Sequence, residues 1–145
     1  MKVIGNLTIT AKNAHEYAEL ESVGGWLYAH VPFNAPALTK VGGSLYVDAT
    51  FTAPALTKVG GSLYVDATFT APALTNIEDE AVSWYSYLLE LRYTVLCTDN
   101  YVHIGCKRHT RDEWAAFTDL EINAMDTDAL SFWREHKDSI LNKNT

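Results

Sequence analysis

The chain has 145 residues, 48% hydrophobic and 20% charged, a composition that supports one compact folded unit and excludes a disordered chain. No apolar run reaches the roughly 20 residues of a membrane-spanning helix, and the alternating N-terminal residues do not resemble a signal peptide, so we expect a cytoplasmic protein with no membrane partner. The net charge of −7 lies mainly in residues 78–145, with thirteen acidic and seven basic residues, which disfavours direct binding to nucleic acid.

An internal repeat dominates the first half of the chain. Residues 35–57 recur without a change at residues 53–75, an offset of 18 residues, and a weaker copy begins at Leu20. A degenerate first copy surrounds Leu7. The equivalent leucines Leu7, Leu27, Leu45 and Leu63 are spaced by 20, 18 and 18 residues. This pattern predicts four stacked coils, with an irregular first coil of the kind that ends repeat arrays.

Each copy has the pattern of strands with one buried face. From Leu45 to Ala55, apolar residues alternate with Tyr46, Asp48 and polar or proline positions. The paired glycines before each leucine predict a corner that uses positive φ, and Pro36, Pro54 and Pro72 predict turns at the other end of each coil. The predicted fold is a short, right-handed, parallel β-solenoid of leucine-rich-repeat type.

Residues 78–145 do not repeat, and we expect them to form a mixed α/β C-terminal cap of a β-hairpin and short helices on the solenoid of residues 1–77. The two regions are expected to form one compact unit. A helix from Asn76 to about Arg92 is predicted from an apolar stripe, although its aromatic content also allows a strand. The stripe consists of Ala81, Trp84, Tyr85, Leu88 and Leu91.

The segment from Tyr93 to Cys106 predicts a hairpin that turns at Asp99 and Asn100. In that register Cys97 lies opposite Val102, too far from Cys106 for a disulfide, so both cysteines are expected to be buried thiols. Two capping boxes, Thr110 to Glu113 and Thr118 to Glu121, then predict two short helices. A third helix is predicted from about Thr127 to Leu141, with Asp126 as its cap.

The repeat L-T-x-V-G-G-x-L-Y-V, at positions 38–47 and 56–65, resembles the leucine-rich-type repeats of phage and prophage proteins. The segment from Val102 to Trp114 is similar to the non-repetitive ends of such proteins. The resemblance covers about half of the chain and implies a phage origin. Because small acidic phage proteins include inhibitors of host defence, such as anti-CRISPR proteins, it also makes the chain a candidate inhibitor of that kind.

Outward positions of stacked coils lie about 4.8 Å apart, so the repeat predicts a ladder of Tyr28, Tyr46 and Tyr64 beside His30, Asp48 and Asp66. Neighbouring carboxylates repel one another, and a cation or a basic partner would relieve that repulsion. The candidate binding residues here are therefore Tyr46, Asp48, Tyr64 and Asp66. Alternatively, such ladders only stabilise the stack. Thr50 with Thr68 forms a further row, too short to favour ice binding.

A second candidate surface is the acidic stretch of residues 112–128, which contains no Lys or Arg. Helix capping explains part of this composition, because acidic groups are favourable in the first turn of a helix. The same residues could instead form one anionic face that imitates a phosphate track for a DNA-binding protein. The candidate residues are Asp112, Glu113, Asp119, Glu121, Asp126 and Asp128.

Metal binding and catalysis have little support in the sequence. Cys97, His103, Cys106 and His109 are zinc-ligand types, but the hairpin places His103 on the face opposite the cysteines, and no C-x-x-C pair exists. A nucleophile elbow and a phosphate-binding loop are also absent. We therefore expect no metal, no cofactor and no enzymatic activity, and an enzyme that uses the region from His103 to His109 is the weakest alternative.

The sequence predicts a non-enzymatic, phage-encoded inhibitor that binds a host protein or ribonucleoprotein complex involved in nucleic-acid handling. Blocking would be steric or would rely on acidic mimicry of DNA. The alternative is a virion or tail-associated module that holds another protein or a glycan. An open end or edge of the solenoid would also allow a homodimer.

Overall fold

The computed structural model describes residues 1–83, 85–88, 91–105 and 107–142. The chain forms two compact units, Met1–Ser83 and Trp84–Thr145. The division lies between Ser83 and Trp84 and not between residues 77 and 78, because the solenoid continues for two more short strands beyond the last repeat.

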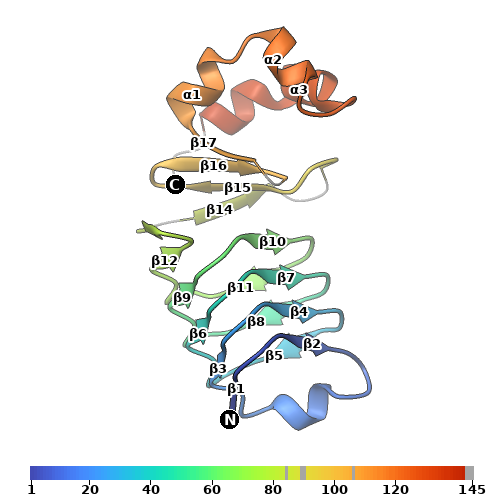
Figure 1. The fold of residues 1–145 in the computed structure, drawn as a ribbon, viewed down its shortest axis with the longest axis vertical. Helices are drawn as coiled ribbons and strands as arrows, with labels where there is room; N and C mark the ends of the chain where they lie inside the picture. The colour runs from blue at the N-terminus through green and yellow to red at the C-terminus, as the bar shows by residue number, and fades with distance from the viewer. Residues whose placement is uncertain (84, 89–90, 106, 143–145) are drawn as a thin grey trace. The chain divides into compact units, whose positions relative to one another are not determined.

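The first unit is the predicted β-solenoid, in which the chain passes through three sheets in turn and successive coils pair in parallel (Figure 1). Sheet A contains β1 (Lys2–Val3), β3 (Ser22–Val23), β6 (Lys40–Val41), β9 (Lys58–Val59), β12 (Asn76–Ile77) and β13 (Glu80–Ala81). Sheet B contains β2 (Leu7–Ile9), β4 (Leu27–Ala29), β7 (Leu45–Val47) and β10 (Leu63–Val65). Sheet C contains β5 (Phe33–Asn34), β8 (Phe51–Thr52) and β11 (Phe69–Thr70).

The register of the coils confirms the prediction from the leucine spacing. Leu7 pairs with Leu27, Leu27 with Leu45, and Leu45 with Leu63, so the four strands of sheet B correspond to four coils. The first coil is irregular as expected, because the 3-10 helix Ala14–Tyr17 occupies the place of a strand in sheet C. The leucines are buried, together with Val23, Val41 and Val59 of sheet A. They form the core of the stack.

The paired glycines serve a different purpose from the one predicted. None of the glycines in the first unit has a positive φ. A Cβ atom at Gly42 would instead lie 2.3 Å from the backbone oxygen of Gly24, and one at Gly60 would lie 2.2 Å from the oxygen of Gly42. Glycine is therefore required because successive coils approach one another too closely at this corner for any side chain.

Side chains and backbone join neighbouring coils at two further positions. The hydroxyl and the amide of Thr39 both donate to the carbonyl oxygen of Glu21. In the next coil, the hydroxyl and the amide of Thr57 donate in the same way to the carbonyl oxygen of Thr39. Directly before the core leucine of the first coil, the Asn6 side chain accepts from the Trp26 amide at 2.9 Å. Each coil thus satisfies polar groups of the preceding one, which fixes the register of the stack.

The helix predicted from Asn76 to about Arg92 is wrong, and the described residues of this segment instead form strands, the alternative that its aromatic content allowed. Asn76–Ile77 pairs in parallel with β9 and antiparallel with β13, through a turn in which Glu78 has a φ of 58°. Tyr85–Leu88 forms a third strand, β14, and Trp84 lies outside the described residues. Ile77 is fully buried as the next residue of the valine column, and this pairing outweighs the helical spacing of the segment.

The described residues of the second unit form a four-stranded antiparallel sheet and three helices. The sheet, sheet D, has the order β14 (Tyr85–Leu88), β15 (Val95–Thr98), β16 (Tyr101–Ile104) and β17 (Lys107–Thr110). Cys97 pairs with Val102, as the predicted hairpin requires. Cys97 is buried, and Cys106 lies outside the described residues. The helices are α1 (Arg111–Ala116), α2 (Asp119–Asn123) and α3 (Ala129–Leu141).

Both predicted capping boxes are present. The Thr110 hydroxyl accepts from the Glu113 amide while the Glu113 carboxylate accepts from the Thr110 amide, and Thr118 and Glu121 do the same at α2. The predicted cap of the third helix is wrong. This helix begins at Ala129 with Asp128 at the N-cap position, and the Asp126 carboxylate instead accepts from the Tyr93 hydroxyl at 2.6 Å.

The core of the second unit joins one side of sheet D to the helices. Trp114 of α1 is buried, and its indole nitrogen donates to the Val102 carbonyl at 2.9 Å. Its ring lies against Trp133 of α3, with 5.3 Å between ring centroids. The other members of this cluster are Val95, Cys97, Val102, Ile104, Ile122, Phe132 and Ile140.

Candidate binding surfaces

The predicted tyrosine ladder exists on the outer face of sheet B. Tyr28, Tyr46 and Tyr64 are in register, and the ring centroids are 5.3 Å apart for the first pair and 4.9 Å for the second. The Tyr46 and Tyr64 rings are inclined by only 5°. The tyrosines therefore form one continuous aromatic surface, held by the parallel backbone pairing beneath it.

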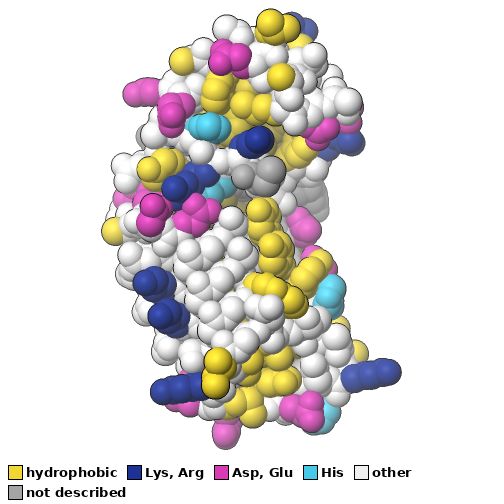
Figure 2. Space-filling view, viewed as in Figure 1, with side chains coloured by type: hydrophobic (Ala, Val, Ile, Leu, Met, Phe, Trp, Pro, Cys, Tyr) yellow, Lys and Arg dark blue, Asp and Glu magenta, His cyan; other side chains and the backbone are white. Residues whose placement is uncertain are grey.

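A polar column runs beside the tyrosines. His30, Asp48 and Asp66 occupy equivalent positions one coil apart, each just after a strand of sheet B. We call these three residues and the three tyrosines the Tyr–Asp ladder. Figure 2 shows a column of hydrophobic side chains along the first unit, with acidic and histidine side chains beside it.

Contacts within the ladder order its side chains. Nδ1 of His30 lies 3.2 Å from Oδ2 of Asp48, and the His30 ring stacks on Tyr28 with 3.9 Å between centroids. The pKa of Tyr28 is raised, first by a hydrogen bond to the Asp48 carboxylate and then by burial and the charges of Asp48 and Asp66. Tyr28 therefore stays a neutral donor at physiological pH, and the negative charge of the ladder resides on the carboxylates.

One feature of the solenoid was not predicted. Lys40 and Lys58 are paired neighbours on sheet A, both exposed, and Lys2 lies on the same sheet in the first coil. The signal was present in the sequence, because lysine precedes valine in both identical copies. The solenoid thus carries a basic column on sheet A and an acidic, aromatic one on sheet B.

The six acidic residues of positions 112–128 are distributed over two helices and a loop. The carboxylates of Glu113 and Glu121 cap α1 and α2. Asp119 pairs with Arg134 of α3 at 2.6 Å, and Asp128 pairs with Arg92. Asp126 accepts from Tyr93 and from the Thr127 amide, and Asp112 is exposed in the first turn of α1.

These contacts weaken the case that residues 112–128 mimic the phosphate backbone of DNA. Arg92 and Arg134, which lie outside residues 112–128 in sequence, bring positive charge beside Asp128 and Asp119. Two further carboxylates are oriented towards the backbone of their own helices. The acidic composition is therefore explained largely by capping and pairing within the second unit.

The capping carboxylates predict the pH dependence of the second unit. The pKa of Glu113 and that of Glu121 are lowered by hydrogen bonds from the backbone of Thr110 and Thr118. A lowered folded-state pKa stabilises the fold above the unfolded pKa, and this contribution is lost as the pH falls through the folded value. We expect the urea midpoint of the second unit to fall from about pH 5 downward.

The variant Glu113→Gln/Glu121→Gln should show a flatter dependence of the urea midpoint over the same pH range, as measured by tryptophan fluorescence. Glu135→Gln/Asp138→Asn removes two carboxylates of α3 that take part in neither capping box, and it serves as the charge-matched control. An equal flattening in the control would contradict the role of the caps.

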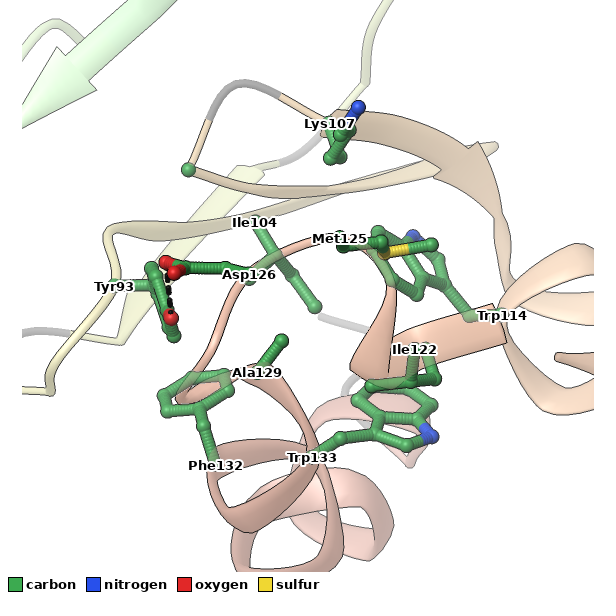
Figure 3. A pocket seen from close by; sticks show the side chains of 11 residues that line it. Tyr93, Ile104, Lys107, Trp114, Ile122, Met125, Asp126, Ala129, Phe132 and Trp133 are labelled. Carbon is green, nitrogen blue, oxygen red and sulfur yellow. Dashed lines mark hydrogen bonds between the residues drawn. The ribbon is translucent and has the colours of Figure 1, made fainter. Parts of the chain in front are cut away.

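A cavity of about 110 Å³ lies within the second unit, between sheet D and the helices (Figure 3). Its walls are mainly apolar and include Trp114, Ile122, Phe132 and Trp133. Tyr93 and Asp126 meet at one end, joined by their hydrogen bond, and the tryptophans lie at the other. Sequence reasoning did not find this cavity, because its walls come from three helices and two strand ends far apart in the chain.

The candidate zinc ligands Cys97, His103 and His109 are not brought together, and Cys106 lies outside the described residues. Leu96 pairs with His103 while Cys97 pairs with Val102, so His103 and Cys97 lie on opposite faces of sheet D, as predicted. His109 packs edge-on against Trp114 and Phe117. Across the described residues, no three His, Cys, Asp or Glu side chains are placed to hold a metal ion.

Among the helices of the described residues, none has the length and apolar character to cross a membrane.

Comparisons with protein-family models, curated proteins and solved structures find no match to this chain.

Proposed function

We propose that this chain is a non-enzymatic binding protein that uses the Tyr–Asp ladder to hold a basic surface of a partner protein. The observation that supports this most directly is the alignment of three stacked tyrosines with two carboxylates on one rigid sheet. Tyrosine is a favoured anchor in protein interfaces, because it offers a large contact area and a hydroxyl at little cost in conformational entropy.

The charge of the ladder determines the kind of partner. Equivalent positions of neighbouring coils lie about 4.8 Å apart, so the charges of Asp48 and Asp66 repel each other, and Asp48 is already in contact with Tyr28 and His30. A Lys or Arg side chain between them relieves this repulsion, and the net charge of −7 attracts a basic surface at longer range.

The DNA-binding surface of a nucleic-acid-handling complex has this chemistry. The resemblance of the repeats to phage proteins makes the defence complexes of a bacterial host, including CRISPR effectors, the first partners to test. The chain would then inhibit the complex by covering its DNA site. In this proposal the principal contact is the solenoid face, and the acidic helices of the second unit are secondary.

The test is a binding titration against purified CRISPR effectors with the two charge-matched variants Asp48→Asn/Asp66→Asn and Asp112→Asn/Asp119→Asn. We expect the first to weaken binding about tenfold and the second to have little effect. Tyr46→Ala/Tyr64→Ala should weaken binding at least as much. Loss of binding with only the Asp112 and Asp119 variant would instead support mimicry by the second unit.

A second candidate is a glycan-binding module of a virion or tail, and one observation favours it. Trp26, which is 38% exposed, directly precedes β4 and lies two residues before Tyr28, so the stacked tyrosines and this tryptophan could offer aromatic rings to a sugar near carboxylates that accept from its hydroxyls. A glycan array distinguishes the two functions. Binding that is lost in Tyr46→Ala/Tyr64→Ala, without the salt dependence of an ionic interface, would support the glycan.

A further inference from the structure

We propose that the cavity of the second unit binds a small, single-ring aromatic compound that carries one hydrogen-bond donor, such as a phenol. The site is separate from the Tyr–Asp ladder, since all the residues that line it belong to residues 93–133. It would give the chain a small-molecule ligand in addition to its protein partner.

The size of the cavity limits the ligand. Pockets for drug-sized ligands and cofactors usually measure about 300 to 1,000 Å³, whereas an apolar cavity of roughly 150 Å³ holds benzene. At about 110 Å³ the cavity of this chain is somewhat smaller than the one that holds benzene, so it has room for at most one ring and cannot hold a nucleotide. The ligand is therefore of the size of benzene or phenol.

The walls favour an aromatic ring. Trp114, Phe132 and Trp133 are each less than one-tenth exposed, and Ile104 and Ile122 complete the buried lining. Aromatic rings interact favourably edge to face, as Tyr93 and Phe132 already do at 4.9 Å between centroids and an interplanar angle of 86°. A ring placed between these side chains would gain such contacts on several sides.

The polar atoms at the rim require a donor on the ligand. The Asp126 carboxylate accepts from the Tyr93 hydroxyl through Oδ2, and through Oδ1 it accepts from the Thr127 amide and from the Thr127 hydroxyl, the latter at 3.3 Å. A carboxylate has about four acceptor positions, so it can accept a further bond. Lys107 lies across from Phe132 and Trp133, and its ammonium group points away from these rings (Figure 3). The indole nitrogen of Trp114 already donates to the Val102 carbonyl.

The experiment titrates the full chain with p-cresol and with toluene, which differ by one hydroxyl, and follows the amide resonances by NMR. We expect shifts at residues 114, 122 and 125, and binding of p-cresol about tenfold tighter than that of toluene, since a hydrogen bond to a charged group contributes this much. No shift with either compound would overturn the proposal, and equal affinities would overturn the role of Asp126.

Two variants separate the contributions of the walls and of the rim. Ala129→Leu fills the cavity and should weaken both compounds at least tenfold, whereas Asp126→Asn, which keeps an acceptor but loses its charge, should reduce the preference for p-cresol while toluene binds as before. Circular dichroism checks that each variant is folded. If Ala129→Leu is folded and binds p-cresol unchanged, the ligand does not occupy this cavity.

The same titration tests whether the cavity instead holds a tyrosine side chain of a partner protein. N-acetyltyrosinamide carries the p-cresol ring on a peptide backbone that the cavity cannot hold. We expect it to bind more weakly than p-cresol. Tighter binding of the peptide compound would overturn the small-molecule assignment in favour of a tyrosine from a partner protein.

Discussion

Gly42→Ala is expected to lower the free energy of unfolding of the first unit by about 3 kcal/mol, because a methyl group at this corner meets the backbone of the coil below. The new Cβ would lie 2.3 Å from the Gly24 oxygen and 3.0 Å from the Gly24 carbonyl carbon. Backbone atoms cannot avoid the clash by changing rotamer, as a side chain can. The coils must therefore separate, which weakens the hydrogen bond from the Gly42 amide to the Val23 oxygen.

Thermal unfolding by circular dichroism measures this effect as a fall in Tm of roughly 12 to 24 °C for a unit of this size. Hydrogen exchange locates the loss in sheets A to C. Gly5→Ala is the matched control, because Gly5 belongs to the same corner in the first coil and a Cβ there would have nothing within 4 Å. The control should change the free energy of unfolding by less than about 1 kcal/mol. Equal losses would show that close approach is not the reason for glycine here.

The glycine corner also shows how far the sequence could predict the fold. The identical copies determined the offset, and the offset determined the register of Leu27, Leu45 and Leu63, which the structure confirms. The predicted reason for the glycines, a positive φ, was wrong. A positive φ concerns the backbone of one residue, whereas the close approach that requires glycine here involves two coils. Distances between coils do not follow from a pattern within one coil.

The second unit shows the same division between local and distant interactions. Capping boxes were predicted because both partners lie within three residues of each other. The partners of Asp119 and Asp128 could not be predicted, because they are separated from them by 15 and 36 residues. The acidic stretch therefore looked more uniform in the sequence than it is in the structure.

Phe51→Ala is expected to destabilise the first unit by about 4 kcal/mol, near the middle of the range for a buried phenylalanine. Phe51 is fully buried. Its ring lies between those of Phe33 and Phe69, with centroid distances of 6.0 and 5.8 Å. Truncation leaves a cavity between two rings that the coils above and below hold in place. Urea unfolding followed by circular dichroism measures the loss.

Phe69→Ala provides a control that few proteins offer. Residues 47–57 and 65–75 have the same sequence, so Phe51 and Phe69 have identical local surroundings in the chain and differ only in their coil. Phe69 is half-buried in the last strand of sheet C, and we expect its truncation to cost about 2 kcal/mol. If local sequence alone determined stability, the two variants would lose the same free energy of unfolding. If packing against neighbouring coils determines it, Phe51→Ala should lose more than Phe69→Ala. A larger loss for Phe51→Ala would therefore support stacking between coils as a source of the stability of a repeat, and equal losses would contradict it.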